Sequence, residues 1–378
     1  MNPTAPEPQP DTPDASPSAK VDFRCDACGA PMTWNPDADA LTCEYCGKSM
    51  PVPRQEAQIV ERPLEHAGAA ARGLGVDVRA VRCGTCGAIF DFASTLTSAS
   101  CVFCGSGNVL AQEANRNALR PESLIPLDVG RADAEASFKK WIGGLWFRPD
   151  ALKKLARFDA VGVYVPCWTF DANVHSDWSA DAGHYYYETQ MVPVMRNGRM
   201  RMELRRVQKV RWVPAWGKRD DAYDDLLVLA SKGLPEALAK KLGAFDTKAL
   251  VPYRPEYLAG WRAEEYQLDL ADAWTLAKER IVATQQARCS GDVPGDTQRS
   301  LRVQNDVRDV RWKHILLPIW SLSYQHSTKR YTVLIHGQNG RVEGEAPLSW
   351  LKILLFVFAV LMALLVVAAI AGVFAAFA

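Results

Sequence analysis

The sequence CDACGAPMTWNPDADALTCEYCG spans residues 25–47, and CGTCGAIFDFASTLTSASCVFCG spans residues 83–105. Each stretch holds two Cys-x2-Cys pairs separated by 14 residues, and the second stretch repeats the first at a displacement of 58 residues. The glycine after each pair allows the left-handed backbone that closes a tight turn around a metal-bound sulfur. Two such turns supply four thiolates in a tetrahedron, which suits Zn²⁺ at about 2.3 Å. The pattern predicts two zinc ribbons with the ligands Cys25, Cys28, Cys43 and Cys46 in the first copy and Cys83, Cys86, Cys101 and Cys104 in the second.

The predicted zinc ions are structural, because four thiolates fill the coordination sphere and leave no position for a reactive water. Disulfides are disfavoured, since the N-terminal residues have no export signal and the cytoplasm keeps thiols reduced. Cys167 and Cys289 stand alone in the sequence and are expected to be small buried hydrophobic residues.

The charge of the ribbon region argues against a nucleic-acid partner. The whole chain has a formal net charge of +1. Residues 20–112 hold 8 basic and 10 acidic residues. Each Zn²⁺ with four thiolates adds a further −2, so this region carries about −6, the wrong sign for a phosphate backbone. A protein-binding or purely structural role is favoured.

The two ends of the chain differ sharply from each other. Residues 1–19 contain six prolines and little that could pack, which predicts a disordered tail. Residues 353–378 contain no charged side chain and would form about 39 Å of helix, more than the ~30 Å of a bilayer core. Arg341 and Lys352 flank only the N-terminal side of this segment. By the positive-inside bias, we expect a single-pass tail anchor in the inner (plasma) membrane, with the N-terminus in the cytoplasm.

The middle of the chain alternates between helical and extended patterns, which predicts an α+β domain with an antiparallel sheet. Asn197-Gly198 between two alternating runs predicts a tight hairpin over residues 190–204. The other predicted elements are helices at 134–146, 149–158 and 264–288, a strand at 160–165, and a closing meander at 308–323, 330–336 and 341–345.

A Pro-x-Trp phrase recurs three times, ending at Trp168, Trp216 and Trp320. The three tryptophans could line one pocket. Alternatively, equivalent strands of an internally duplicated unit could each bury a tryptophan in the core, which is the favoured interpretation.

A basic strip accompanies the predicted hairpin. Arg199, Arg201 and Arg205 alternate with Met200, Met202 and Leu204, so the two sets should point to opposite faces. Three readings remain open: a solvated face that discourages aggregation, a surface for anionic lipid headgroups, or a nucleic-acid surface. The candidate residues of the strip are Arg196, Arg199, Arg201, Arg205, Arg206, Lys209 and Arg211.

Residues 171–187 gather His175, Asp177, Asp181 and His184, but their spacing matches no established ligand pattern. The chain has no nucleophile elbow, no HExxH and no phosphate-binding loop. The nearest approach to such a loop, Cys46-Gly-Lys-Ser49, lies inside a zinc knuckle. We therefore expect that the chain is not an enzyme.

The four CxxCG knuckles, the stretch VYVPCWTFDANVHSDWSADAGHYYY at 163–187 and the apolar tail resemble a bacterial group of twin-zinc-ribbon proteins. Members carry a C-terminal transmembrane helix and are often labelled primosomal protein N′ or replication-restart helicase. Helicase activity does not carry over, because this sequence has no Walker motif to match.

The predicted organisation is multidomain: a tail at 1–19, zinc ribbons at 20–60 and 61–112, an α+β domain at 113–350 and a transmembrane helix at 351–378. The favoured function is a membrane-tethered cytoplasmic adaptor that binds protein partners through its ribbons. The alternative is a membrane-anchored nucleic-acid-binding protein that uses the basic hairpin, with no helicase activity.

Overall fold

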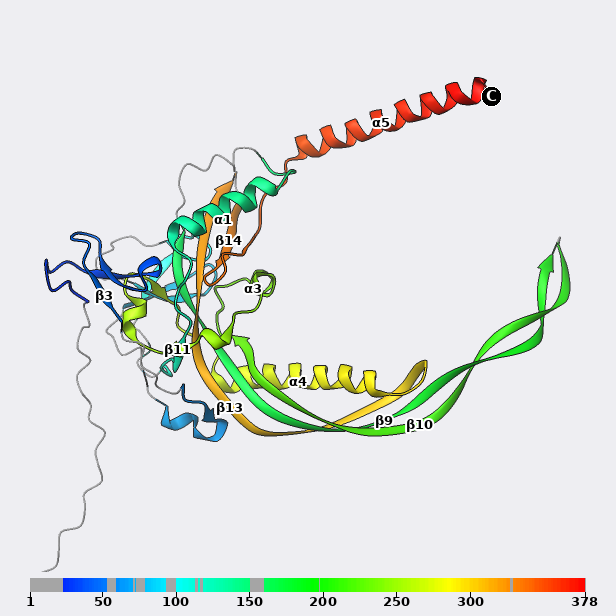
Figure 1. Ribbon diagram of the computed structural model, residues 1–378, viewed down its shortest axis with the longest axis horizontal. Helices are drawn as coiled ribbons and strands as arrows, with labels where there is room; N and C mark the ends of the chain where they lie inside the picture. The colour runs from blue at the N-terminus through cyan, green and yellow to red at the C-terminus, as the bar shows by residue number, and fades with distance from the viewer. Residues whose placement is uncertain are drawn as a thin grey trace, which may run out of the picture.

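Two small sheets, one large curved sheet and four α-helices make up the described part of the chain (Figure 1). The computed structural model describes residues 23–52, 59–70, 72, 79–92, 100–112, 115, 118–149, 160–196, 198–326 and 329–377. The predicted tail at 1–19 and the predicted helix at 149–158 lie almost wholly outside these residues. The fold class expected from the sequence is confirmed.

Each cysteine repeat forms a three-stranded antiparallel sheet. The first contains β1 (Met32–Asn35), β2 (Ala40–Cys43) and β3 (Ser49–Pro51), in that order. The second contains β5 (Arg79–Cys83), β6 (Ile89–Phe92) and β7 (Val109–Gln112), in the order β6-β5-β7. Between β1 and β2 the chain forms the 3₁₀ turn η1 (Pro36–Ala38), where Asn35 Oδ1 accepts from the Asp37 amide at 3.0 Å.

The large sheet has the strand order β10-β9-β13-β14-β15. Its strands are β9 (Val161–Arg196), β10 (Arg199–Leu229), β13 (Thr297–His326), β14 (Lys329–His336) and β15 (Val342–Gly344). The predicted closing meander is thus confirmed as β13-β14-β15. Four two-residue strands pair at the edges: β4 (Arg62–Pro63), β8 (Ser123–Leu124), β11 (Val251–Pro252) and β12 (Arg262–Ala263). β4 lies in the range expected for the second ribbon but pairs with β13.

The first two long strands extend far beyond the predicted hairpin. β9 has 36 residues, which at about 3.3 Å per residue is roughly 119 Å of chain. Gly198, with φ 75°, turns the chain into β10 where the Asn-Gly signal placed it. β9 pairs with β13 only as far as Gly183, opposite Thr297. Beyond that point β9 and β10 pair only with each other, and we call residues 184–196 and 198–211 the arm.

Bulges explain why the sheet curves. β10 is irregular between Tyr223 and Leu226, and β13 is irregular between Arg308 and Arg311. These positions lie on the two sides of Asp171 in the central strand β9. A bulge bends its strand and increases the local twist, so the long strands β9, β10 and β13 curve away from the body (Figure 1).

The helix α4 (Leu270–Asp292) lies along the long strands (Figure 1). It begins at Asp269, whose side chain accepts from the Asp272 amide at 2.9 Å. The predicted start at 264 is too early because residues 262–263 form β12. It contacts β9, β10 and β13, and its buried residues recur every three or four positions: Leu270, Ala273, Ala277, Ile281, Gln285 and Cys289.

The other helices frame the body. α1 (Arg131–Gly144) confirms the helix predicted at 134–146, and α3 (Glu236–Leu242) is a short helix that sequence analysis did not assign. The 3₁₀ turns besides η1 are η2 (Leu64–Ala69), η3 (Thr247–Ala249) and η4 (Pro255–Leu258). α5 (Trp350–Phe377) projects away from the body (Figure 1). Its residues 350–367 have a mean hydropathy of 2.8 and none is buried, so α5 is long and apolar enough to span a membrane.

The tryptophans of the three Pro-x-Trp motifs differ in burial. Trp168 and Trp320 are buried, and their indole N–H groups donate to the carbonyls of Leu268 and Val129, both at 2.9 Å. Trp216 lies on the long strand β10 and is 78% exposed. Burial in the core is therefore found for two of the three tryptophans, the three do not form one pocket, and the internal duplication stays a prediction.

Candidate metal centres and basic hairpin

All four knuckles adopt one backbone geometry. In the first, the Gly29 amide donates to the Cys25 carbonyl at 2.8 Å, and Gly29 has φ 72°. The corresponding bonds from Gly47, Gly87 and Gly105 measure 2.8 to 3.0 Å, with φ between 67° and 80°. An L-residue with a side chain rarely adopts this conformation, which accounts for glycine after every pair.

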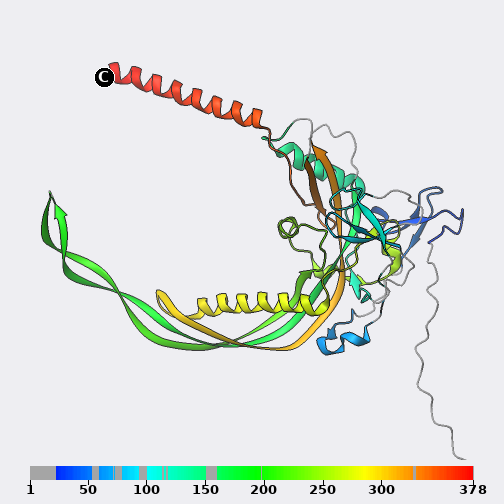
Figure 2. The same cartoon turned by 180° about the vertical axis from the view of Figure 1, so that it is seen from behind.

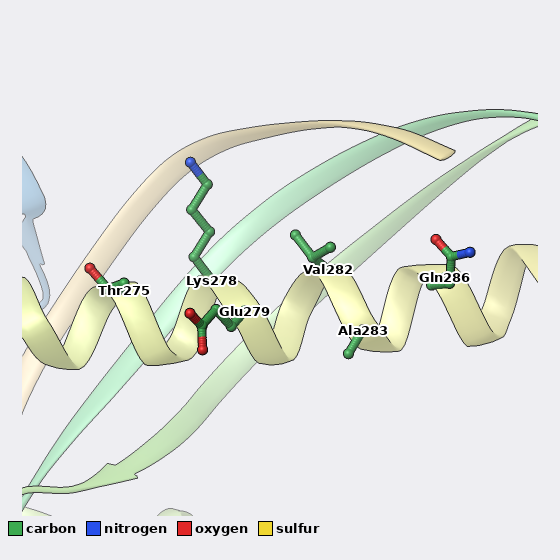
Figure 3. Close-up of a pocket in the computed structure, with 6 residues that line it drawn as sticks. All are labelled: Thr275, Lys278, Glu279, Val282, Ala283 and Gln286. Carbon is green, nitrogen blue, oxygen red and sulfur yellow. The ribbon is translucent and has the colours of Figure 1, made fainter. Parts of the chain in front are cut away.

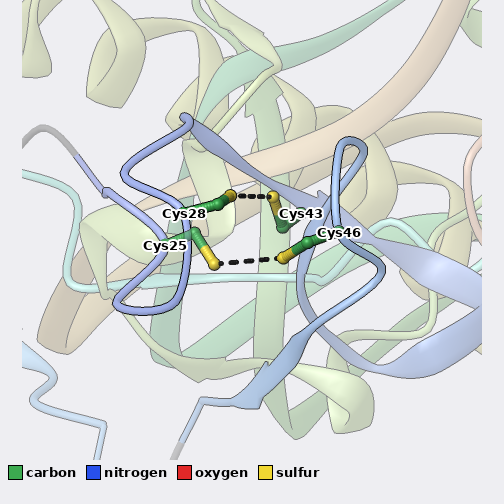
Figure 4. A group of neighbouring side chains, drawn as sticks. All are labelled: Cys25, Cys28, Cys43 and Cys46. Atoms are coloured by element: carbon green, nitrogen blue, oxygen red, sulfur yellow. Dashed lines mark hydrogen bonds between the residues drawn. The ribbon is translucent and has the colours of Figure 1, made fainter.

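The cysteine sulfurs converge into two clusters, as the spacing predicted (Figure 4 shows the first). The Sγ atoms of Cys25 and Cys46 lie 3.5 Å apart, as do those of Cys28 and Cys43. In the second cluster the pairs Cys83–Cys104 and Cys86–Cys101 lie 3.6 and 3.5 Å apart. A tetrahedral ion with bonds of about 2.3 Å to sulfur requires sulfurs about 3.8 Å apart, so both clusters could hold an ion such as Zn²⁺.

The pKa values of the clustered cysteines shift in both directions: they are lowered at Cys25, Cys43 and Cys101 and raised at Cys28, Cys46, Cys86 and Cys104. The amides of Cys46 and Tyr45 lower the pKa of Cys43 to about 7. A hydrogen bond from the Cys86 thiol lowers the pKa of Cys101 to about 5, and the same bond raises the pKa of Cys86. Thiolates are the metal-binding form of cysteine, so Cys43 and Cys101 are the sulfurs that the knuckle geometry prepares for a cation.

The first ribbon is fastened to the body through aromatic side chains. Trp34 in β1 is buried, packs edge-on against Tyr257 with ring centroids 4.6 Å apart, and donates its amide to the Ala259 carbonyl at 2.9 Å. The Trp261 indole donates to the Trp34 carbonyl at 3.0 Å and packs against Trp320. The ribbon therefore shares one core with the large sheet.

The second ribbon sits on β13 and β14 through its last knuckle. Phe103 is buried, and its carbonyl accepts hydroxyls from Ser323 at 2.7 Å and Thr332 at 3.0 Å. The Val102 carbonyl accepts the Ser321 hydroxyl at 2.6 Å. Sequence analysis missed this contact, although the alternation of Ser321 and Ser323 in an apolar strand was a usable signal.

The first ribbon keeps one side open to solvent. Tyr45, between the two cysteines of its second knuckle, is 80% exposed, and Met50 in the edge strand β3 is also exposed. Cys28 and Cys46 are exposed as well, whereas Cys86 and Cys104 of the second cluster are half-buried.

The arm is a two-stranded hairpin with the arginines of the basic strip on one face and apolar side chains on the other. Arg201 is paired with Val194, and Met202 is paired with Pro193. Directly opposed residues share a face, so Met195, Met200 and Met202 occupy one face while Arg199, Arg201 and Arg205 occupy the other. This is the arrangement expected from the alternation.

The other members of the strip are placed as follows. Lys209 and Arg211 share the face of Arg201, and Lys209 pairs with Glu188. Arg206 is on the opposite face and stacks over Tyr187, with its guanidinium carbon 4.3 Å from the ring centroid. Arg196 ends β9, and its side chain lies outside the described part of the structure.

Of the four His/Asp residues noted at 171–187, His175 and Asp177 come together, with His175 Nε2 3.6 Å from Asp177 Oδ2, but Asp181 and His184 do not join them. His175 Nδ1 lies 2.6 Å from Asp220 Oδ1, and Asp177 pairs with Lys218 at 2.9 Å. Asp181 lies six residues beyond His175 along β9, and therefore about 20 Å from it, and it pairs with Arg299. His184 lies on the opposite face of the strand.

A buried ionic cluster that sequence analysis missed lies where the two bulges meet β9. Lys313 is buried, with Nζ 2.7 Å from Asp225 Oδ1 and 3.0 Å from Glu61 Oε1. Burial raises the pKa of nearby Asp171 to about 6, although Asp171 accepts the Asp225 amide at 2.7 Å. Asp171, Asp224 and Asp225 could group around a cation, and Lys313 supplies a positive charge there.

One open hollow of about 460 Å³ lies on α4 (Figure 3). Its walls come from that helix alone: Thr275, Lys278, Glu279, Val282, Ala283 and Gln286. No second element of the described structure lines it, so it lacks the convergent polar groups of a ligand site.

The chain is similar to the uncharacterised protein YdjG of Bacillus subtilis strain 168. The two are 25% identical over 333 residues, which cover 87% of this chain and 91% of YdjG. No family model matches the chain, and no solved structure matches it.

Proposed function

We propose that this chain is a membrane-anchored cytoplasmic adaptor whose two ribbons are held by structural zinc and whose first ribbon binds a protein partner. The observation that carries the proposal is the position of the first ribbon. It lies on the side of the body opposite to that from which α5 and the arm project (Figures 1 and 2). A bilayer that contains α5 therefore leaves the first ribbon facing the cytoplasm.

Zinc supports this function by fixing the ribbon surface. Four thiolates complete a tetrahedral shell, so the ion stabilises the ribbon and offers no position for catalysis. The proposal assigns the chain no catalytic step. The features that the chain shares with the primosomal-protein group are the zinc ribbons and the apolar tail.

The docking surface consists of the second knuckle of ribbon 1 and its edge strand. Tyr45 and Met50 are exposed there, and exposed aromatic and methionine side chains are typical of protein-binding surfaces. The outer edge of β3 has no neighbouring strand in the described structure and offers main-chain groups to an extended peptide.

Membrane anchoring is supported by α5 and by the charges around it. None of the residues 350–367 is buried inside the described structure. Arg341 precedes α5 and Lys352 lies in its first turn, and positive charge at this end of the helix favours a cytoplasmic body in the inner (plasma) membrane.

The test places a photo-crosslinking phenylalanine analogue at Tyr45 in the full chain, expressed in bacterial cells. A matched variant carries the analogue at Trp146, an exposed aromatic residue outside the ribbon. We expect discrete protein adducts from position 45 that position 146 does not give, in membranes that retain the chain after an alkaline wash. Identical adduct patterns would refute the docking surface, and release of the chain by the wash would refute the anchor.

A further inference from the structure

The tip of the arm carries an exposed apolar face that nothing in the described structure covers. Met195, Met200 and Leu204 are 73%, 72% and 69% exposed. The register places all of its members on one face of the two-stranded ribbon: Met191, Pro193, Met195, Met200, Met202 and Leu204. An isolated two-stranded ribbon is only marginally stable in water, so this face requires a partner.

The opposite face of the same tip is basic. Arg199, Arg201 and Arg205 lie there with Val192 and Val194, and Arg205 also contacts Glu203 at 3.4 Å. An apolar face backed by arginines is the pattern of an element that lies in the interface of an anionic bilayer. The apolar side chains enter the acyl boundary, and the guanidinium groups remain at the level of the lipid phosphates.

The position of the arm favours a bilayer as its partner. Both views show α5 and the arm leaving the body on the same side, and the tip curves toward the side of α5 (Figures 1 and 2). Residues 184–196 reach about 43 Å beyond the last pair with β13. A membrane that holds α5 is therefore the nearest apolar surface of opposite charge.

We propose that residues 191–205 form an amphipathic β-hairpin that docks on the anionic cytoplasmic leaflet, as a second membrane contact in addition to α5. This inference rests on the proposed anchoring by α5. The arm then holds the body at a fixed orientation, with ribbon 1 directed away from the lipid.

The test reconstitutes the full chain into vesicles with a photoactivatable phospholipid that reacts from its acyl chain. One set contains only phosphatidylcholine, and the other contains phosphatidylcholine and phosphatidylglycerol at about 7:3. Cleavage after glutamate then releases the tip as Thr189–Glu203 and α5 in the fragment that begins at Ala346. Mass spectrometry measures the lipid adducts on both fragments.

We expect adducts on the tip fragment in the anionic vesicles, and at least tenfold fewer in the neutral ones. Each charge near the surface strengthens the attraction about fivefold, so R199Q/R201Q/R205Q should weaken it about a hundredfold. M195Q/M200Q/M202Q should remove the tip adducts, whereas V192Q/V194Q on the arginine face should keep them.

The α5 fragment separates failure of this inference from failure of the proposed function. Adducts on α5 but not on the tip would overturn the docking and leave the anchor intact. Adducts on the tip alone would support the docking and refute the anchor, and adducts on neither fragment would refute both. Tip adducts that survive R199Q/R201Q/R205Q, while the same variant abolishes salt-sensitive binding of single-stranded DNA, would assign the arginines to nucleic acid and overturn the inference.

Discussion

Lys313 Nζ lies 2.7 Å from Asp225 Oδ1 at the point where two strand bulges meet β9, and the lysine side chain is buried while that of Asp225 is partly exposed. Glu61 provides a second carboxylate at 3.0 Å from the same ammonium group, and thereby ties the segment before the second ribbon to the sheet. These three side chains therefore link three segments that are distant in the sequence.

Replacing Lys313 with methionine should destabilise the protein strongly. The substitution preserves the length of the side chain but leaves the carboxylates of Asp225 and Glu61 without their shared cation. Breaking a buried pair from one side costs about 3–5 kcal/mol. Chemical unfolding of the detergent-solubilised chain measures this loss, with Lys232→Met at an exposed position as the control. Equal stability of the two variants would contradict the role of the pair.

Asp171→Asn should stabilise the protein above about pH 6. Burial raises the pKa of Asp171 to about 6, above its value in the unfolded chain, so the folded protein binds this proton more tightly. The charged carboxylate thus costs free energy at pH 7–8, and that cost disappears as the pH falls through 6 toward 4. Asparagine is neutral at every pH and can still accept the Asp225 amide.

The measurement for Asp171→Asn is a series of melting temperatures between pH 5 and 8. We expect the variant to melt a few degrees above the wild type at pH 8, with the difference shrinking toward pH 5. Asp224→Asn, at the exposed neighbour, is the matched control. A difference that grows as the pH falls would contradict the assignment.

The metal content of cysteine variants tests the two centres separately. The wild-type chain should contain two zinc ions, and Cys43→Ser and Cys101→Ser should each retain one, because three thiolates bind the ion far more weakly. Cys289→Ala, which removes a buried cysteine outside both clusters, should retain two. Elemental analysis of the purified chain counts the ions, and two ions in Cys43→Ser would refute the first centre.

The two ribbon variants should also differ in which part of the body they loosen. Loss of the second ion releases the knuckle whose two carbonyls accept the hydroxyls of Ser321, Ser323 and Thr332, so β13 and β14 lose three hydrogen bonds. Loss of the first ion loosens the packing of Trp34 against Tyr257 instead. Hydrogen exchange of the two regions distinguishes these outcomes.

The cysteine clusters and the hairpin turn could be predicted from sequence because their signals are local. Four sulfurs with glycines at fixed spacing have one low-energy arrangement, and Asn197-Gly198 has one favoured turn. The apolar run of α5 is local in the same sense. The register of the tip also followed directly, since side chains alternate along a strand.

The length of the strands could not be predicted, because residues 171–184 contain aspartate, asparagine and glycine at positions that resemble turns. Pairing with β13 on one side and β10 on the other keeps this polar segment extended. The cluster around Lys313 depends on Glu61, which lies 252 residues away, and on bulges that leave no periodic signal. Both features arise only when the tertiary structure forms.

The last prediction concerns the tryptophans of the Pro-x-Trp motifs. Trp320 is buried between α1 and the first ribbon, donates to the Val129 carbonyl and packs against Trp261. Its replacement by alanine should cost about 3–5 kcal/mol, because the cavity that remains cannot collapse. Trp216→Ala removes the same type of side chain from an exposed position on β10. It should change the free energy of unfolding by less than about 0.5 kcal/mol.

Urea unfolding of both tryptophan variants, followed by far-UV circular dichroism, measures this difference. Trp320→Ala should also weaken zinc retention by the first ribbon, since Trp261 joins Trp320 to the carbonyl of Trp34. A chelator competition at the first centre reports that coupling, and Trp216→Ala should leave it unchanged. Equal chelation rates in the two variants would show that the aromatic chain holds the ribbon in place without stabilising its metal.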